Sequence, residues 1–131
     1  MKRDLMDEKI AAAVQGRARG GPLRCAEAFH IAGELAVTPL AVGRTADALG
    51  VRLVRCQLGL FGHGERKSIV EPAEEVSPEL EQAIREGLIL GRLPCAVVWA
   101  IAARFEMPKL HVANAAESLE IRISQCQLGA F

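Results

Sequence analysis

The chain contains no tyrosine, and aromatic residues make up only 4% of its 131 residues. It also lacks an apolar run near the roughly 20 residues of a membrane-spanning helix, and its first residues, MKRDLMDEK, lack a signal-peptide apolar region. We therefore expect a soluble, cytoplasmic protein with no membrane association. Half of the residues are apolar, mostly Ala, Leu, Ile and Val, so an aliphatic core is available. The length suits one compact domain or two small ones that support each other.

Signals for catalysis are equally scarce. The three histidines, His30, His63 and His111, have no carboxylate or cysteine repeated beside them at a useful spacing. The glycine-rich stretch GRARGG (16–21) lacks the preceding strand that phosphate-binding loops require, so we interpret it as a loose basic patch. The sequence predicts no enzyme and no catalytic residue.

The four cysteines allow two interpretations. Cys25, Cys56, Cys95 and Cys126 form none of the short C-x2-C spacings that are typical of zinc sites. In a cytoplasmic chain disulfides are not expected, and we favour small buried hydrophobic side chains without a metal or cofactor. The alternative is a four-thiolate metal or iron–sulfur site.

An internal repeat is the strongest feature of the sequence. Residues 25–61 align without a gap on residues 95–131, with 14 of 37 positions identical, and both stretches end in Cys-Gln-Leu-Gly-x-Phe. A fixed period indicates one structural unit used twice, with a shared apolar core. We predict an all-α fold made of a tandem, pseudo-two-fold repeat: a first unit over 1–61, a linker over 62–76 and a second unit over 77–131.

Each copy is expected to contain several short helices. The predicted pairs are 4–17 with 78–90 and 23–36 with 93–106, followed by a helix from Thr38-Pro39 to Leu49 and its counterpart. The 23–36 and 93–106 helices are apolar nearly all round, which predicts central, buried positions. For 51–58 and 121–128 a short strand is an alternative, but we favour helix because each ends in Gln-Leu-Gly. The linker stretch Glu65–Val70 is expected to be an extended arm or a β wing.

The order Ala46, Leu49, Gly50, Val51 is similar to the turn of the helix-turn-helix and winged-helix units of bacterial transcription regulators. The resemblance implies a recognition helix after Gly50 that contacts double-stranded DNA. Arg52, Arg55 and Gln57 would be its exposed side chains, and Arg66 and Lys67 would contact the DNA backbone as a wing does.

Charge favours the first copy for this role. Residues 1–67 carry +4 and residues 68–131 carry −4, and Glu120 replaces the turn glycine in the second copy. We expect DNA contact through the first copy, and a homo-oligomer or protein partner through the second. Two alternatives remain open: a helical protein–protein interaction or scaffold module that binds no nucleic acid, and the four-thiolate metal protein.

Overall fold

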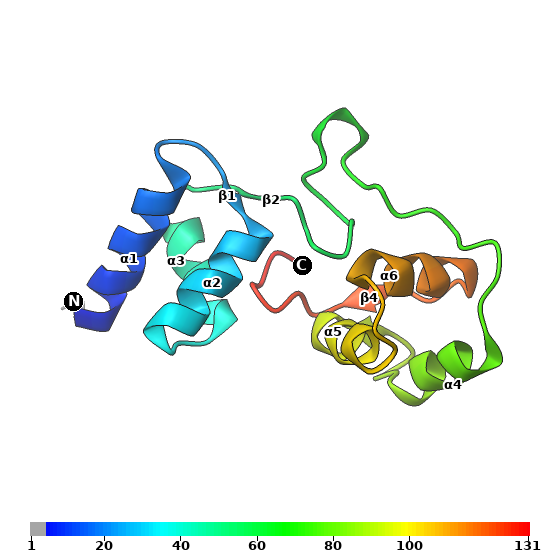
Figure 1. The fold of residues 1–131 in the computed structure, drawn as a ribbon. Coiled ribbons are helices and arrows are strands. Elements are labelled where there is room, and N and C mark those ends of the chain that lie inside the picture. The colour runs from blue at the N-terminus through cyan, green and yellow to red at the C-terminus, as the bar shows by residue number, and fades with distance from the viewer. Residues whose placement is uncertain (1–4) are drawn as a thin grey trace. The chain divides into compact units, whose positions relative to one another are not determined.

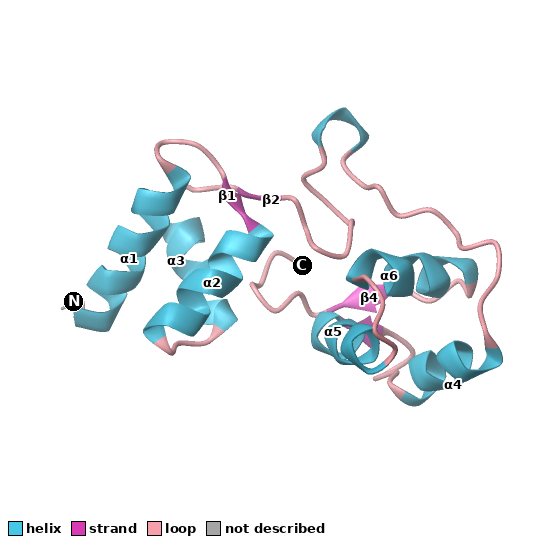
Figure 2. Ribbon diagram, viewed as in Figure 1, coloured by secondary structure: helices cyan, strands magenta, loops and turns pink. Residues whose placement is uncertain are grey.

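The structure is a computed structural model and describes residues 5–131. The described chain is mainly helical, as predicted, with short parallel strand pairs (Figures 1 and 2). The helices are α1 (Leu5–Ala18), α2 (Cys25–Leu35), α3 (Pro39–Ala48), α4 (Pro78–Glu86), α5 (Cys95–Arg104) and α6 (Lys109–Ser118), with one 3-10 turn, η1 (Gly64–Arg66). The strands are β1 (Leu23–Arg24), β2 (Leu53–Val54), β3 (Leu93–Pro94) and β4 (Ile123–Ser124).

The elements divide into two compact units. Unit 1 contains the residues up to Cys56 together with Gln127–Ala130, and unit 2 contains Gln57–Cys126 together with Phe131. In unit 1, α1, α2 and α3 pack on one another, and in unit 2 α5 packs on α4 and α6 (Figure 1). The most deeply buried side chains are aliphatic: Ile10, Val14, Leu23, Ile31, Val42 and Leu128 in unit 1, and Leu58, Ile84, Leu93, Val98 and Val112 in unit 2.

Two helices begin at the signals that predicted them. The Thr38 hydroxyl accepts a hydrogen bond from the amide of Ala41 at 3.1 Å, and Pro39 occupies the first turn of α3. Ser77 accepts from the amide of Leu80 at 3.2 Å, with Pro78 in the first turn of α4. These side chains satisfy amides that have no partner within the helix, which fixes where each helix starts.

Helix ends depend on residues in the left-handed conformation. Ala36 (φ 54°) follows α2, and Gly50 (φ 70°) follows α3. In each case the next amide bonds back into the helix, from Val37 to the Ala32 carbonyl at 3.0 Å and from Val51 to the Ala46 carbonyl at 2.9 Å. Glu106 and Glu120 end α5 and α6 in the same way. This hydrogen bond, from an amide to the carbonyl five residues earlier, ends a helix even where glycine is absent.

The helix predicted over 78–90 is shorter than expected. It ends at Glu86, and the chain then turns back between Ile89 and Arg92, whose backbones exchange bonds of 2.8 and 3.1 Å. The two central residues, Leu90 and Gly91, have φ of 52° and 79°. Positive φ at both positions makes a tight hairpin turn, which a continuing helix would not allow.

The preference for helix over 51–58 and 121–128 is wrong. Residues Leu53–Val54 form β2, which pairs in parallel with β1, and Ile123–Ser124 form β4, which pairs with β3. The amide of Leu23 donates to the carbonyl of Arg52 at 2.8 Å. The alternating, β-branched sequence therefore forms an extended segment because a strand in the same unit is available to pair with it. The Gln-Leu-Gly residues form turns rather than helix ends.

The linker over 62–76 forms no strand, so the β-wing interpretation is wrong. Its one regular element is the 3-10 turn η1, and the chain beyond it is extended (Figure 1). The side-chain carbonyl of Asn114 accepts from the amide of Glu71 at 3.0 Å, and the backbone carbonyl of Asn114 accepts from Ala73 at 3.1 Å. The amides of the linker are thus held along α6 by the side-chain and backbone oxygens of Asn114, without a β-hairpin that could serve as a wing.

The predicted all-round burial of the second helices is also wrong. In α2, Ala28 and Ile31 are fully buried, but Phe29 is half-buried and His30 is exposed. In α5, Trp99 is likewise half-buried. A unit of three short helices has too little volume to surround any one of them, so each helix keeps one side toward solvent.

Within the described residues no single helix is long and apolar enough to cross a membrane. The helices α2 and α3 meet that test of length and composition only as a pair, and the chain bends by 117° between them.

Candidate nucleic-acid interface

The strand pair of unit 1 carries three exposed arginines. Arg24 lies in β1, and Arg52 and Arg55 flank β2. Arg24 pairs in register with Val54, and side chains on a strand alternate between faces, so Arg24 and Arg52 lie on the same face of the pair. The opposite face carries Leu23, which is completely buried. The strand pair therefore fixes an aliphatic face inside the unit and a face outside it that carries Arg24 and Arg52. Arg55 lies one residue beyond β2, where φ of 52° ends the alternation, and its side chain is also exposed. We call these three exposed arginines, Arg24, Arg52 and Arg55, the arginine surface.

The arginine surface is a property of unit 1. At the equivalent positions of unit 2 stand Pro94, Arg122 and Gln125, so one of the three cations remains. The net charges of the two units also differ, positive in unit 1 and negative in unit 2. Residues 1–56 hold nine Lys and Arg against six Asp and Glu, giving +3, while residues 57–126 hold seven against ten, giving −3. Only unit 1 combines a positive charge with a set of exposed arginines on one paired element, and a polyanion is attracted to such a surface.

The structure separates the five residues predicted to contact DNA. Arg52 and Arg55 lie in unit 1, whereas Gln57, Arg66 and Lys67 lie in unit 2. Gln57 is half-buried at the end of the strand segment, Arg66 ends η1, and Lys67 follows it with φ of 61° and an exposed side chain. Because 51–58 is not helical, Arg52, Arg55 and Gln57 do not form the exposed face of a recognition helix.

A bent pair of helices, α2 and α3, lies one helix earlier than the segment that resembled the helix-turn-helix motif. The three residues 36–38 join α2 to α3, and the chain bends by 117° between them. Two helices at about 90–120° joined by three or four residues is the geometry of that motif. The small residue, Ala32, is buried four positions before the left-handed Ala36. The sequence predicted this break, between a helix over 23–36 and one from Thr38, but not its likeness to the motif, because alanine rather than glycine occupies the left-handed position.

The residue order at this turn could have marked it as a second match to the motif. Ala32, Leu35, Ala36 and Val37 repeat the order of small, apolar, left-handed and apolar residues seen at Ala46, Leu49, Gly50 and Val51. The Thr38-Pro39 start signal follows directly, so a second helix had to begin there. After Gly50 no such start signal occurs, and the structure has a strand.

The second helix of this pair, α3, offers few polar groups to a nucleic acid. Its exposed side chains are Leu40, Arg44, Asp47 and Ala48. A groove of about 360 Å³ lies between α3 and α1, lined by Asp7, Ala11, Ala41, Arg44, Thr45, Ala48 and Leu49. Arg44 is the only cation of α3 and shares this groove with an acidic residue. The arginine surface on the strand pair is therefore the stronger candidate for contact with an anion.

The cysteines fall two to each unit. Cys25 and Cys56 lie in unit 1 and Cys95 and Cys126 in unit 2; the first three are buried and Cys126 is half-buried. Over residues 5–131 no three His, Cys, Asp or Glu side chains are grouped so that they could hold a metal ion.

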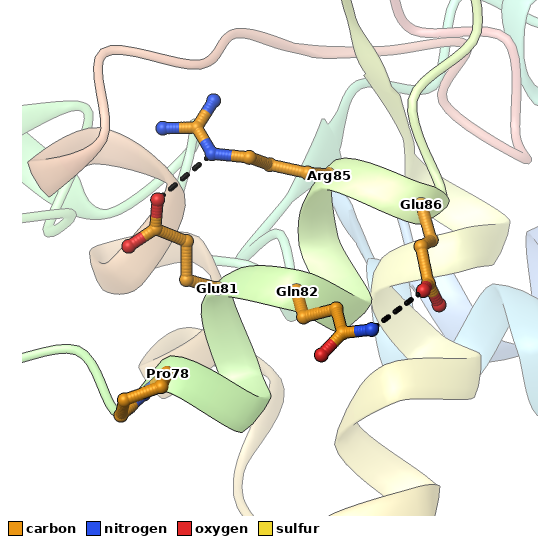
Figure 3. A pocket seen from close by; sticks show the side chains of 5 residues that line it. All are labelled: Pro78, Glu81, Gln82, Arg85 and Glu86. Carbon is orange, nitrogen blue, oxygen red and sulfur yellow. Dashed lines mark hydrogen bonds and ion pairs between the residues drawn. The ribbon is translucent and has the colours of Figure 1, made fainter.

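A second cavity, of about 480 Å³, lies on the outer surface of α4 (Figure 3). It is lined by Pro78, Glu81, Gln82, Arg85 and Glu86. Figure 3 shows that the polar side chains engage one another: Arg85 with Glu81 at 2.8 Å, and Gln82 with Glu86 at 3.0 Å. Pairs spaced by four residues are common on solvated helix faces, so we assign this cavity no chemistry.

No family model, curated protein or solved structure matches the chain.

Proposed function

We propose that this is a DNA-binding, transcription-regulator-like protein of the cytoplasm, built from two tandem helix-turn-helix-like units of which unit 1 contacts double-stranded DNA. The observation that carries the proposal is the arginine surface, which lies on the strand pair next to the α2–α3 helix–turn–helix. Elements at offsets of 70 residues, such as β1 and β3 or α2 and α5, support a common origin for the two units.

The contact is made to phosphate more than to bases. Arginine binds phosphate oxygens with its planar, forked donors, and Arg24 and Arg52 share one face. A two-residue strand cannot fill a major groove, and the exposed side chains of α3 include an aspartate. We therefore expect weak, salt-dependent binding with little sequence preference, which a second chain joined through unit 2 would strengthen.

Salt dependence gives the sharpest test. When three arginines each contact a phosphate, a plot of the logarithm of the binding constant against the logarithm of the salt concentration has a slope of about −2.7. The double substitution Arg52→Ala with Arg55→Ala should reduce the magnitude of that slope by about 1.8, because two phosphate contacts are lost. Fluorescence anisotropy of a labelled mixed-sequence duplex, followed from low to physiological salt, measures both values.

The matched control is Arg122→Ala, which removes the arginine equivalent to Arg52 from unit 2. It should leave both affinity and slope unchanged. Absence of binding at low salt, or an equal loss in the Arg122→Ala variant, would refute the assignment of DNA contact to unit 1.

A protein–protein interaction module is the second candidate, and one observation favours it. Leu90 is 99% exposed and Ile89 is 51% exposed at the tip of the hairpin turn of unit 2. Unit 1 has Arg19 and Gly20 at these positions. If Leu90→Asp abolishes self-association in sedimentation while wild-type protein binds no DNA at low salt, the interaction module is the function that remains.

A further inference from the structure

Each unit is completed by a segment from the other copy of the repeat. The chain passes from unit 1 to unit 2 after Cys56 and from unit 2 to unit 1 after Cys126, two positions that are equivalent in the repeat. The leucine of each Gln-Leu-Gly segment is buried in its unit: Leu128 is 2% exposed in unit 1, and Leu58 is 1% exposed in unit 2. The two segments are therefore exchanged, and each is part of a core.

The site for residues 127–130 is built around a glycine in the middle of α3. Gly43 is buried, and a Cβ atom placed on it would fall on the carbonyl oxygen of Leu128. Glycine weakens a helix interior, and here it allows the backbone of the segment to lie directly on the helix. Next to it, a Cβ on Gly129 would stand 2.8 Å from Cδ1 of Leu40. The site thus admits a leucine followed by a residue with no side chain.

The site in unit 2 also holds a Gln-Leu-Gly segment against a helix, but the residues around it differ. A Cβ on Gly59 would stand 2.6 Å from Cδ1 of Leu110, the equivalent of Leu40. The carbonyl of Gly59 also accepts from the amide of Ile69 at 2.8 Å and from the hydroxyl of Ser68 at 3.2 Å. Ala113 stands where unit 1 has Gly43. The linker thus fastens residues 57–61 in unit 2, whereas in unit 1 the segment lies against a bare stretch of helix backbone.

We propose that the surface of α3 around Leu40 and Gly43 is a binding site for a Gln-Leu-Gly segment, and that a second copy of this chain fills it by exchange of residues 127–130. A site that is filled by a segment joined through another unit accepts the identical segment of a second chain, because every contact is reproduced. The partner is a second copy because both segments of this chain carry the Cys-Gln-Leu-Gly-x-Phe sequence that the sites accommodate. This inference is independent of DNA binding.

Complementation between two full-length variants tests it. Gly43→Val blocks the α3 site and leaves residues 127–130 unchanged. Leu128→Asp prevents residues 127–130 from binding and leaves the α3 site unchanged. When the two variants are unfolded together and refolded at high concentration, they should form a heterodimer with one intact unit 1, detected by light scattering. Each variant refolded alone should remain a monomer, while wild-type protein should form a dimer whose fraction rises with concentration.

Gly33→Val is the matched control, because a Cβ on that exposed glycine of α2 would meet no atom within 4 Å. This variant should exchange as wild-type protein does. A heterodimer that fails to form, or one that Gly33→Val prevents as fully as Gly43→Val does, overturns the proposal.

A peptide experiment covers the case in which the variants fold poorly. The peptide SQCQLGAF, added to the Leu128→Asp chain, should bind saturably and raise its thermal midpoint. The same peptide with aspartate in place of leucine should not. A Gly43→Val substitution in the receiving chain should weaken binding about tenfold or more, as overpacking of a tight contact does. Absence of any binding or stabilisation by the wild-type peptide contradicts the site.

Discussion

The ammonium nitrogen of Lys109 lies 4.2 Å from the centre of the Trp99 ring. Trp99 belongs to α5, and Lys109 is the first residue of α6. The ring is half-buried, so the lysine covers part of the face that the small unit leaves toward solvent. A cation over an indole face is attracted by the negative charge of the ring's π electrons. Trp99 is the only tryptophan of the chain, so its fluorescence reports on unit 2 alone.

Replacing Lys109 by methionine keeps an unbranched side chain over the ring and removes the charge. We expect Lys109→Met to lower the free energy of unfolding by about 0.5–1 kcal/mol, the usual strength of a partly exposed cation–π contact. A denaturant titration followed by tryptophan fluorescence gives the value. Lys67→Met, an exposed lysine of the same unit, is the control and should change stability by much less. Equal effects of the two substitutions would mean that the ring contact contributes nothing.

Truncation of the tryptophan should cost less than its size alone suggests. The sequence predicted that the helix over 93–106, which contains Trp99, is central and buried, and truncation of a buried ring costs about 3–5 kcal/mol. Because the ring is half-buried, we now expect a loss of about 2 kcal/mol. Denaturant titration followed by circular dichroism measures it, since the variant has no tryptophan. A loss above 4 kcal/mol would show that the ring is more enclosed than its exposure indicates.

The start of α3 depends on one hydroxyl. Thr38→Ala removes the acceptor of the Ala41 amide and should lower the free energy of unfolding by about 1 kcal/mol. Thr38→Ser keeps the oxygen and should retain most of that stability, in the same thermal and denaturant measurements. The equivalent position in unit 2 is Pro108, which makes no side-chain cap. If Thr38→Ser costs as much as Thr38→Ala, packing of the methyl group is responsible and the cap is not.

Two equivalent helix ends carry different residues in the same conformation. Gly50 ends α3 with φ of 70°, and Glu120 ends α6 with φ of 59°. Glu120→Gly should raise the free energy of unfolding by about 1 kcal/mol, because a side chain is strained at positive φ. Gly50→Ala should lower it by a similar amount, since a Cβ there has open space and only the backbone conformation opposes it. Thermal unfolding of both variants checks the opposite signs. A stabilising Gly50→Ala would contradict the left-handed turn.

The local sequence predicted the starts of α3 and α4 and the mainly helical fold. The helices predicted from 23 and 93 begin two residues later, because Leu23–Arg24 and Leu93–Pro94 pair as strands. Thr38-Pro39 and Ser77-Pro78 each place an oxygen and a preset φ angle within four residues, so no distant contact is needed to fix them. The ends predicted for the helices over 23–36 and 93–106 lie within two residues of the observed ones. The left-handed conformation of Ala36, Glu106 and Glu120 was not predicted, because their residue types do not favour it.

The candidate interface could be predicted only in part. Arg52 and Arg55 were identified from the sequence, and the structure places both on the surface of unit 1. Arg24, which shares a face of the strand pair with Arg52, was missed because it is 28 residues from Arg52 and joins it only through the pairing of β1 with β2. Pairing between distant strands depends on which backbone groups meet in the folded unit, and a local pattern does not contain that information.

By itself, the sequence determined where α3 and α4 begin, which side chains are apolar enough to form a core, and that the charge of the first copy is positive. These properties follow from neighbouring residues or from composition. The tertiary structure decided that residues 51–58 pair as a strand, that the arginine surface forms, and that the Gln-Leu-Gly segments exchange between units. Each of these depends on contacts between residues far apart in the chain, such as Gly43 with Leu128, whose free energy exists only after the units have folded.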